Sequence, residues 1–215
     1  YILFLSFTCV SAAGYEKNGN IEETKRTIID CAGRRVEIPG KIERIACLYA
    51  FSGHAVTMLG RGDDIIAVSN GLKRDSLLHR ICPSILNAFV PKAQGSINIE
   101  ELLRARPDIL FLPADVNQNK AETDKLEKFK IPYLVVDYKN IKEQQRAVTM
   151  IGEVLNENER AASYNRDYNE SMKKVRAVTS MIPDDKKLRL FHSVNEANRT
   201  NINTNLSTDW LDVMG

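Results

Sequence analysis

The stretch TIIDCAGRRVEIPGKIERIACL, residues 27–48, decides how this chain folds. Residues 36–38 alternate between apolar and charged, which is the two-residue period of a strand, and Gly33 supplies the left-handed conformation that a tight turn requires. Pro39 ends the second arm, and residues 45–48 form a short apolar run typical of a parallel strand covered on both faces. The stretch therefore predicts two extended arms joined by a turn, followed by the first strand of a parallel sheet.

Strand-like and helix-like segments alternate along the rest of the chain, which is typical of an α/β fold. Apolar runs that predict strands lie at residues 45–48, 65–68, 109–112, 133–136 and 188–191. Helical patterns lie at residues 99–106, 122–129, 141–155 and 157–181, with breaks at Asn156 and Pro183. In the longest pattern the apolar side chains recur at steps of three and four, which predicts one long amphipathic helix.

The composition is that of an ordinary globular protein, with 43% hydrophobic and 27% charged residues in a chain of 215. The formal net charge is only +2, which gives no reason to expect binding to nucleic acid. The length is sufficient for one large domain or for one and a half smaller ones.

The N-terminus differs from the rest of the chain. Residues 1–10 are apolar and uncharged, and a triplet of small residues, 11–13, follows as in the cleavage site of a secretory signal peptide. We interpret residues 1–13 as the remnant of a signal peptide and the polar residues 14–26 as a flexible tether. A lipid anchor at Cys9 and a buried N-terminal strand are the alternatives. The mature protein is then expected outside the cytoplasm, in the periplasm or at the cell surface.

Several segments together resemble one protein family. Residues 27–39 follow the pattern T-x-x-D-x-x-G-R-x-V-x-I-P, and an Arg-Ile pair follows at residues 44–45. The later units of the family are matched by NIEELLRARPDILFLP (98–113), LEKFKIPYLVVD (126–137) and DWLDVMG (209–215). The chain thus resembles the substrate-binding proteins of ABC importers for iron–siderophore complexes, haem and cobalamin.

The resemblance implies an α/β fold of two Rossmann-like lobes joined by a long helix, with the second lobe only partly present. Residues 27–155 are then the N-terminal lobe, residues 156–182 the connecting helix, and residues 183–215 the start of a truncated C-terminal lobe. The alternative for residues 157–181 is an ordinary amphipathic helix that lies on one lobe, because periodicity alone does not separate the two.

Ligands of open parallel sheets bind outside the carboxyl ends of the strands, so the loop after the first predicted strand is the first candidate site. Tyr49 and Phe51 are expected to stack on a flat ligand, and His54 to ligate a metal or donate to an acidic group. Ser52 is expected to open a helix at residues 55–59 and to leave backbone N–H groups for an anion. The alternative is that Ser52 only caps this helix and that Tyr49 packs in the core.

Polar residues also follow the other predicted strands. Lys73 and Arg74 follow the second strand and suit the anionic groups of a ligand, although a pair of loop charges is usually only solvated. Asp115, Asn117 and Tyr138 follow the third and fourth strands, at positions that fit the rim of a cleft.

The stretch FHSVNEANRT after the last predicted strand is dense in polar groups, and a rigid strand would hold such a loop in place. Its residues that are expected to contact the ligand, opposite His54 across the cleft, are His192, Asn195, Glu196 and Arg199. The alternative is a solvated loop of Asn and Thr turns.

The resemblance also implies a partner. Glu100 lies in the NIEELL segment, where members of the family carry an exposed glutamate that pairs with arginines of the membrane permease. Glu101 is its neighbour and is expected to point elsewhere on the helix. The protein is then expected to be a monomer that is peripheral to the membrane and meets it through the ABC importer permease.

Motifs of catalysis are absent from the sequence: it has no nucleophile elbow and no Gly-rich phosphate loop. Its three histidines lack His-x-His spacing. The preferred hypothesis is a binding protein that is not an enzyme and carries no cofactor. Its ligand would be a small-molecule metal chelate, either an iron complex of the siderophore kind or a corrinoid, captured between two lobes for an ABC importer. The alternatives are a bare metal ion or haem as ligand, and an α/β enzyme of the chelatase kind.

Overall fold

The computed structural model describes residues 24–93, 96–194, 196–200 and 209–214. Its centre is a sheet of the four strands β3 (Ile45–Cys47), β4 (Ile65–Val68), β7 (Ile109–Pro113) and β8 (Tyr133–Val136). Each strand ends within one residue of its predicted bounds, so these predictions are confirmed. The predicted signal peptide remnant, residues 1–13, lies outside the described residues.

The four strands lie in the order β4-β3-β7-β8 and are all parallel. The chain therefore adds one strand on one side of β3 and then crosses over to add two on the other side. Such a reversal creates a crevice between β3 and β7 at the carboxyl edge of the sheet, where ligands of doubly wound sheets bind. This topology confirms the predicted α/β fold class with a Rossmann-like lobe.

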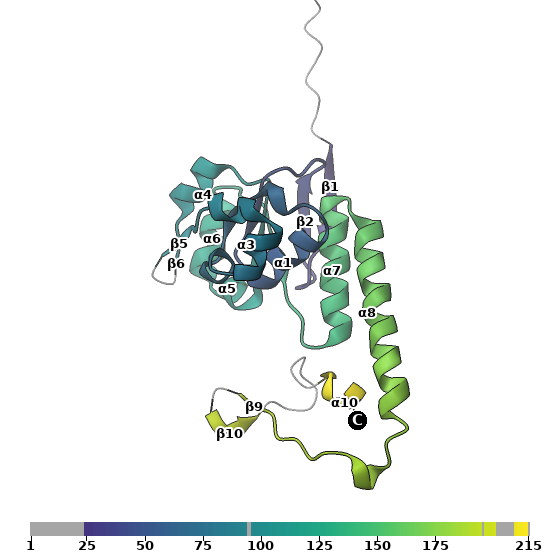
Figure 1. Ribbon diagram of the computed structural model, residues 1–215. Helices are drawn as coiled ribbons and strands as arrows, with labels where there is room; N and C mark the ends of the chain where they lie inside the picture. Colours follow the sequence, from purple (N-terminus) through teal and green to yellow (C-terminus); the bar gives the residue numbers. More distant parts are fainter. Residues whose placement is uncertain (1–23, 94–95, 195, 201–208, 215) are drawn as a thin grey trace, which may run out of the picture.

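Short helices connect the strands and cover the sheet (Figure 1). They are α1 (Ala50–Met58), α2 (Asn70–Lys73), α3 (Ser76–Ile81), α4 (Ile99–Ala105), α5 (Ala114–Gln118) and α6 (Lys120–Lys128). The connections also contain the 3-10 helices η1 (Gly62–Asp64) and η2 (Pro83–Asn87), and the strand pair β5 (Lys92–Ala93) and β6 (Ser96–Ile97). The helices predicted at residues 99–106 and 122–129 correspond to α4 and α6.

Both faces of the sheet are buried. In β7, Ile109 and Phe111 point into a core shared with α1, whereas Leu110 and Leu112 point into a second core shared with α4 and α6. All four side chains are fully buried. Burial on both faces explains why this strand reads as an unbroken apolar run.

The quoted stretch opens with an antiparallel hairpin of β1 (Lys25–Ile29) and β2 (Arg35–Pro39), turned at Gly33 with φ +79°. β1 begins at Lys25, so the prediction of a tether over residues 14–26 is wrong for its last two residues. Arg26 gives the physical reason, because its guanidinium donates to the carbonyl oxygens of Glu153 and Val154 and to Oδ1 of Asn156. These acceptors belong to the end of a long helix, whose last carbonyls have no partner within the helix.

That helix, α7 (Ile141–Leu155), forms an antiparallel hairpin with α8 (Asn158–Thr179) beside the sheet (Figure 1). The bounds of α7 are those predicted, and α8 begins and ends one or two residues inside its prediction. The chain reverses at Asn156, which adopts φ +59°. Gly152 lets the two helices approach, since a Cβ atom there would lie 2.6 Å from that of Ala161.

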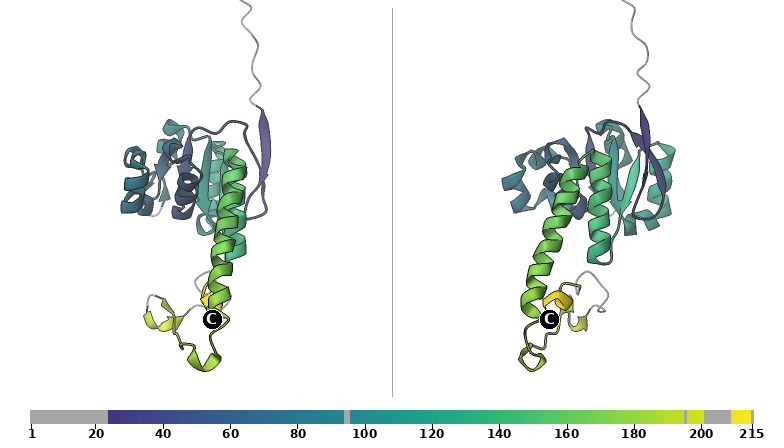
Figure 2. Two further views of the ribbon diagram at one scale, coloured as in Figure 1. Left: turned by 45° about the vertical axis from the view of Figure 1, so that its right-hand side comes forward. Right: turned by 90° about the vertical axis from the view of Figure 1, so that its right-hand side faces the viewer.

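The two halves of α8 have different surroundings. Its first half packs on α7, with Ala161 fully buried. Its second half runs past the end of α7 and reaches α10 (Leu211–Met214), as both views of Figure 2 show. Val175 and Val178, in this second half, are exposed.

The C-terminal segment contains η3 (Asp184–Lys186) and the antiparallel pair β9 (Ser193–Val194) and β10 (Glu196–Thr200). The strand predicted at residues 188–191 is wrong, because these residues belong to no strand. Leu188 is 93% exposed, and within the described residues no strand lies beside it to pair with its backbone or to cover its side chain. An apolar run forms a strand only when a neighbouring strand hydrogen-bonds its backbone and other residues cover its side chains.

Candidate ligand-binding site

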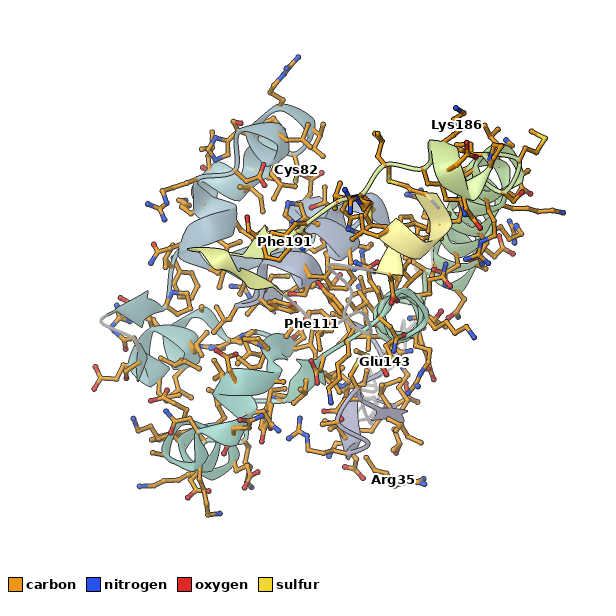
Figure 3. All side chains as sticks on the ribbon, turned by 90° about the horizontal axis from the view of Figure 1, so that it is seen from below. Arg35, Cys82, Phe111, Glu143, Lys186 and Phe191 are labelled. Carbon is orange, nitrogen blue, oxygen red and sulfur yellow. The ribbon has the colours of Figure 1, made fainter. Side chains whose placement is uncertain are left out.

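The carboxyl edge of the sheet brings together the segments that follow β3, β7 and β8. Figure 1 shows this edge turned toward β9 and β10, which lie below it. Figure 3 looks at the molecule from that side, and both Phe111 of β7 and Phe191 near β9 lie close to the middle of the view. The candidate site is therefore sought among the loops that follow these strands at the carboxyl edge.

Three aromatic rings cluster at this edge. Tyr49 follows β3, Phe51 lies in the first turn of α1, and Tyr138 follows β8. The ring centroids of Phe51 and Tyr138 lie 4.6 Å apart, and each lies 6.2 Å from that of Tyr49. Tilted rings at these separations attract one another and hold their common orientation. All three are half-buried, so they present one aromatic surface, which we call the aromatic trio.

The sequence places Tyr138 only at a position that fits the rim of a cleft. Burial raises the pKa of its hydroxyl well above the ordinary value, and hydrogen bonding with Tyr49 raises it further. The phenol is therefore neutral at physiological pH. A residue placed just after a strand shares an edge with residues placed just after its parallel neighbours, and this was the signal that could have joined Tyr138 to Tyr49.

His54 lies in α1 and forms a close pair with Asp75, 2.9 Å between Nε2 and Oδ2. Asp75 also caps α3, because its Oδ1 accepts from the N–H groups of Leu77 and Leu78. The N–H of Leu78 and the imidazole of His54 together lower the pKa of the Asp75 carboxyl. Sequence reasoning missed Asp75, which lies 21 residues from the histidine and is brought to it by the packing of α2 against α1.

Ser52 is fully buried, and its hydroxyl donates to the carbonyl oxygen of Tyr49 at 2.7 Å. The prediction that the helix begins at residue 55 is wrong, because α1 begins at Ala50 and contains Ser52 in its first turn. Burial raises the pKa of the neighbouring Cys47 thiol to about 12, so it is protonated. Ser52 therefore faces the interior and supports Tyr49 from beneath.

Lys73 ends α2, which follows β4, and Arg74 is the next residue, but the two differ in their surroundings. The Lys73 ammonium donates to the carbonyl oxygens of Ile85, Leu86 and Ala88 around η2. These bonds satisfy the end of a short helix and occupy all three of its donors. Arg74 is exposed, and its Nε donates to the carbonyl oxygen of Asn70 at 3.3 Å.

Four residues of the C-terminal segment are predicted to contact the ligand, and the structure describes them to different extents. His192 is half-buried and meets the ring of Trp210 edge-on, with centroids 6.4 Å apart. Its Nδ1 is buried without a hydrogen-bond partner among the described residues. Glu196 and Arg199 lie in β10, and Asn195 falls outside the described residues.

Glu100 is exposed in the first turn of α4, and it borders a shallow groove of about 390 Å³. The groove is apolar in part, because Leu103 and Phe129 are exposed within it. Glu101 is less exposed and lines a separate hollow with Phe89. The two neighbouring carboxylates thus belong to different surfaces, as predicted from their positions on the helix.

The described part of the chain contains no group of three or more His, Cys, Asp or Glu side chains arranged to hold a metal ion. Among the same residues, no helix combines the length and the apolar character needed to cross a membrane.

Residues 45–214 match the model of a family described as periplasmic binding protein. The match takes in the parallel sheet, the α7–α8 hairpin and the C-terminal segment, and it extends over most of the chain. The chain belongs to the periplasmic binding protein family. A comparison with curated proteins gave no match.

Solved periplasmic binding proteins share this fold. The molybdate periplasmic binding protein MolA of Haemophilus influenzae, solved with molybdate bound, has a TM-score of 0.68 at 20% identity, over 76% of this chain and 56% of its own. The TroA-like periplasmic binding protein FepB of Veillonella parvula has a TM-score of 0.60 at 21% identity, over 73% and 50%. The heme binding protein HmuT has a TM-score of 0.58 at 14% identity, over 75% and 50%. This periplasmic binding protein chain therefore spans about half the length of these neighbours.

Proposed function

We propose that this protein is an extracytoplasmic solute-binding protein that captures an iron complex of the siderophore kind, or a corrinoid, and delivers it to an ABC importer. The observation that carries the ligand class is the aromatic trio at the carboxyl edge of the sheet. It lies where ligands of doubly wound sheets bind. Membership in the periplasmic binding protein family supports transport in place of catalysis.

The proposed architecture has two lobes. Residues 27–155 form the N-terminal lobe, residues 156–182 the connecting helix, and residues 183–215 the start of the C-terminal lobe. The different surroundings of the two halves of α8 support this division, because one half packs on the first lobe and the other bridges to the C-terminal segment. A helix resists bending more than a pair of extended strands does, so the lobes are expected to close only slightly.

The chemistry of the trio favours a ligand with a flat or unsaturated face. Aromatic rings contribute about 0.5–1.5 kcal/mol for each well-placed ring pair, beyond the area they bury. The phenol of Tyr138 is neutral, and its hydroxyl is engaged with Tyr49, so it is not a ready anionic ligand for bare iron. A chelated metal therefore suits this surface better than a bare ion, and haem remains the second candidate.

The remaining proposed contacts come from both of the proposed lobes. His54 is held by Asp75, which leaves its other ring nitrogen as a donor or acceptor for the ligand. Ser52 and Lys73 act indirectly, because both are engaged in bonds within the lobe, and Arg74 remains an exposed cation at the periphery. The opposite contacts are proposed at His192, Asn195, Glu196 and Arg199.

Ligand binding by the complete protein tests the proposal. Quenching of intrinsic fluorescence is measured with a ferric catecholate, a ferric hydroxamate, cyanocobalamin, haemin, Fe³⁺ alone and molybdate. We expect tight binding of one chelate class. Tyr138→Ala should lower the affinity for that chelate about tenfold to a hundredfold, because it removes a ring that contributes roughly 1.5–3 kcal/mol to the binding free energy.

Tyr138→Phe is the matched control, since it keeps the ring and removes only the hydroxyl. It should bind within a few-fold of the natural protein if stacking carries the interaction. Binding of molybdate or Fe³⁺ alone, with no chelate bound, would show the proposed ligand class to be wrong. Multiple turnover of a bound complex would instead favour the chelatase-like enzyme.

A further inference from the structure

The amino end of α7 is capped from within its own segment and from a distant one. Oδ1 of Asn140 accepts from the N–H of Glu143 at 2.9 Å, and Oε2 of Glu143 accepts from the N–H of Lys139 at 2.7 Å. The N–H of Ile141 has a different partner. It donates to Oδ2 of Asp209 at 2.9 Å, across 68 positions of sequence.

The start of α7 does not depend on the hydrogen bond from Ile141 to Asp209. Asn140 already caps this helix, and Glu143 already reaches back to the N–H of Lys139, the residue before the cap. A carboxylate at the positive end of the helix dipole is favourable in addition, so Asp209 is held there by charge and by a hydrogen bond. The contact therefore ties the segment before α10 to the lobe that contains the sheet.

The surroundings of Asp209 are cationic. A cavity of about 730 Å³ between α7, α8 and α10 is lined by Lys142, Lys173 and Arg176, and among the lining residues that the structure describes Asp209 is the single carboxylate. The three cations come from α7 and α8, whereas Asp209 comes from the C-terminal segment. This charge distribution favours the position of Asp209 at the cavity and opposes its departure.

A second contact holds the other end of α10. Oγ1 of Thr179, the last residue of α8, donates to the carbonyl oxygen of Val213 at 2.7 Å. Val213 is itself buried. The two contacts lie on opposite ends of one short helix, so α10 is pinned between the amino end of α7 and the carboxyl end of α8.

We propose that Asp209 is a clasp that fixes the C-terminal segment to the amino end of α7 and so limits the separation of the two lobes. This inference rests on the two-lobed binding protein proposed above. The clasp lies next to the proposed site in sequence, since Ile141 is three residues after Tyr138 of the aromatic trio. The proposed ligand contact and the clasp thus lie on one short stretch of backbone.

Amide hydrogen exchange of the complete, ligand-free protein tests the clasp by NMR. Asp209→Ala should speed exchange of the Ile141 amide about fivefold to tenfold, as expected for loss of a charged cap. It should also speed exchange of the Val213 and Met214 amides, both of which donate to Trp210 within the α10 turn. A cap with only a local role would change Ile141 alone, so unchanged Val213 and Met214 amides would overturn the proposal.

Thr179→Val tests the clasp from the other end of α10, and it remains available if the Asp209→Ala variant does not fold. It removes the hydroxyl at the far end of α10 and touches neither Asp209 nor α7. Faster exchange at Ile141 in this variant supports the clasp, whereas an Ile141 rate equal to that of the natural protein contradicts it. Glu170→Gln is the control, because Glu170 is an exposed carboxylate on the same helix. These rates are measured without ligand, so they stand apart from the binding panel and from any failure of the proposed ligand class.

Discussion

At the scale of single residues, Asp30 accounts for much of the opening sequence pattern. Its carboxylate is fully buried, and it accepts from the backbone N–H groups of Ala32, Arg34 and Val135 at 2.9–3.0 Å. The Arg34 guanidinium binds the same carboxylate through two nitrogens and lies 4.1 Å over the ring of Tyr133. One aspartate thus shapes the hairpin turn, pairs with an arginine and satisfies an edge N–H of β8.

We expect Asp30→Ala to lower the free energy of unfolding by about 3–5 kcal/mol, because it leaves a partly buried arginine and three N–H groups without their acceptor. Urea denaturation followed by circular dichroism measures this loss. Glu37→Ala in the same hairpin is the control. Glu37 pairs with Lys25 at an exposed site, so its loss should cost less than about 1 kcal/mol. Equal effects of the two substitutions would refute this account of the motif.

At the scale of elements, the α7–α8 hairpin depends on close approach at one point. Asn156 takes the left-handed conformation that ends α7, and its side chain is held by Arg26 of β1 at 2.8 Å. The two helices then meet at Gly152 and Ala161. The geometry at Gly152 governs how α8 leaves the first lobe and hence where its second half leads.

Gly152→Ala separates helix propensity from packing. Propensity alone predicts a gain of about 0.8–1 kcal/mol in the middle of a helix. Packing predicts a net loss of about 1–3 kcal/mol, because the added methyl group would lie 2.6 Å from the Cβ of Ala161 and 3.2 Å from the carbonyl oxygen of Glu157. Thermal unfolding decides between them, and a variant with a raised Tm would be evidence against tight contact here.

Gly71→Ala is the control for this measurement. Gly71 also lies within a helix, but a Cβ atom there meets nothing closer than 3.8 Å. This substitution should be neutral or slightly stabilising.

At the scale of the whole molecule, two surfaces have different proposed roles. The carboxyl edge of the sheet faces the C-terminal segment and is proposed to hold the ligand. The groove beside Glu100 lies on α4 and α6, away from the aromatic trio, and combines exposed apolar side chains with a carboxylate. We propose this groove as the surface that meets the permease, with Glu100 paired to its arginines. The protein would then be a monomer that reaches the membrane only through this partner.

Charge reversal at Glu100 tests the second role in the complete protein. Glu100→Arg should reduce uptake of the transported chelate by cells at least tenfold, because it sets like charges against each other at the interface. The affinity for the ligand should not change. Glu101→Arg is the control. It removes the same favourable interaction of a carboxylate with the start of α4, which is worth about 0.3–1 kcal/mol. Because Glu101 lines another hollow, this variant should retain uptake. Unreduced uptake with Glu100→Arg, or weakened ligand binding, would remove the docking role.

The candidate site shows which kinds of contact a sequence can predict. The positions of Tyr49, Phe51 and Tyr138 follow from strand ends, because parallel strands bring their carboxyl ends to one edge. The partners of polar side chains do not follow in this way. Lys73 turned out to bind carbonyl oxygens around η2, and His54 to pair with Asp75. Such bonds depend on how the connecting helices pack, and nothing in local periodicity encodes that packing.

The sequence by itself determined the fold class, the four central strands, the bounds of α7 and the break at Asn156. Each of these rests on local rules, namely the period of apolar residues and the conformations that Gly, Pro and Asn favour. Only the tertiary structure decided that residues 188–191 form no strand, that α1 begins before Ser52, and that Asp209 caps α7. These outcomes depend on which groups meet across long stretches of chain, since a backbone or a carboxylate takes the partner that packing brings within reach.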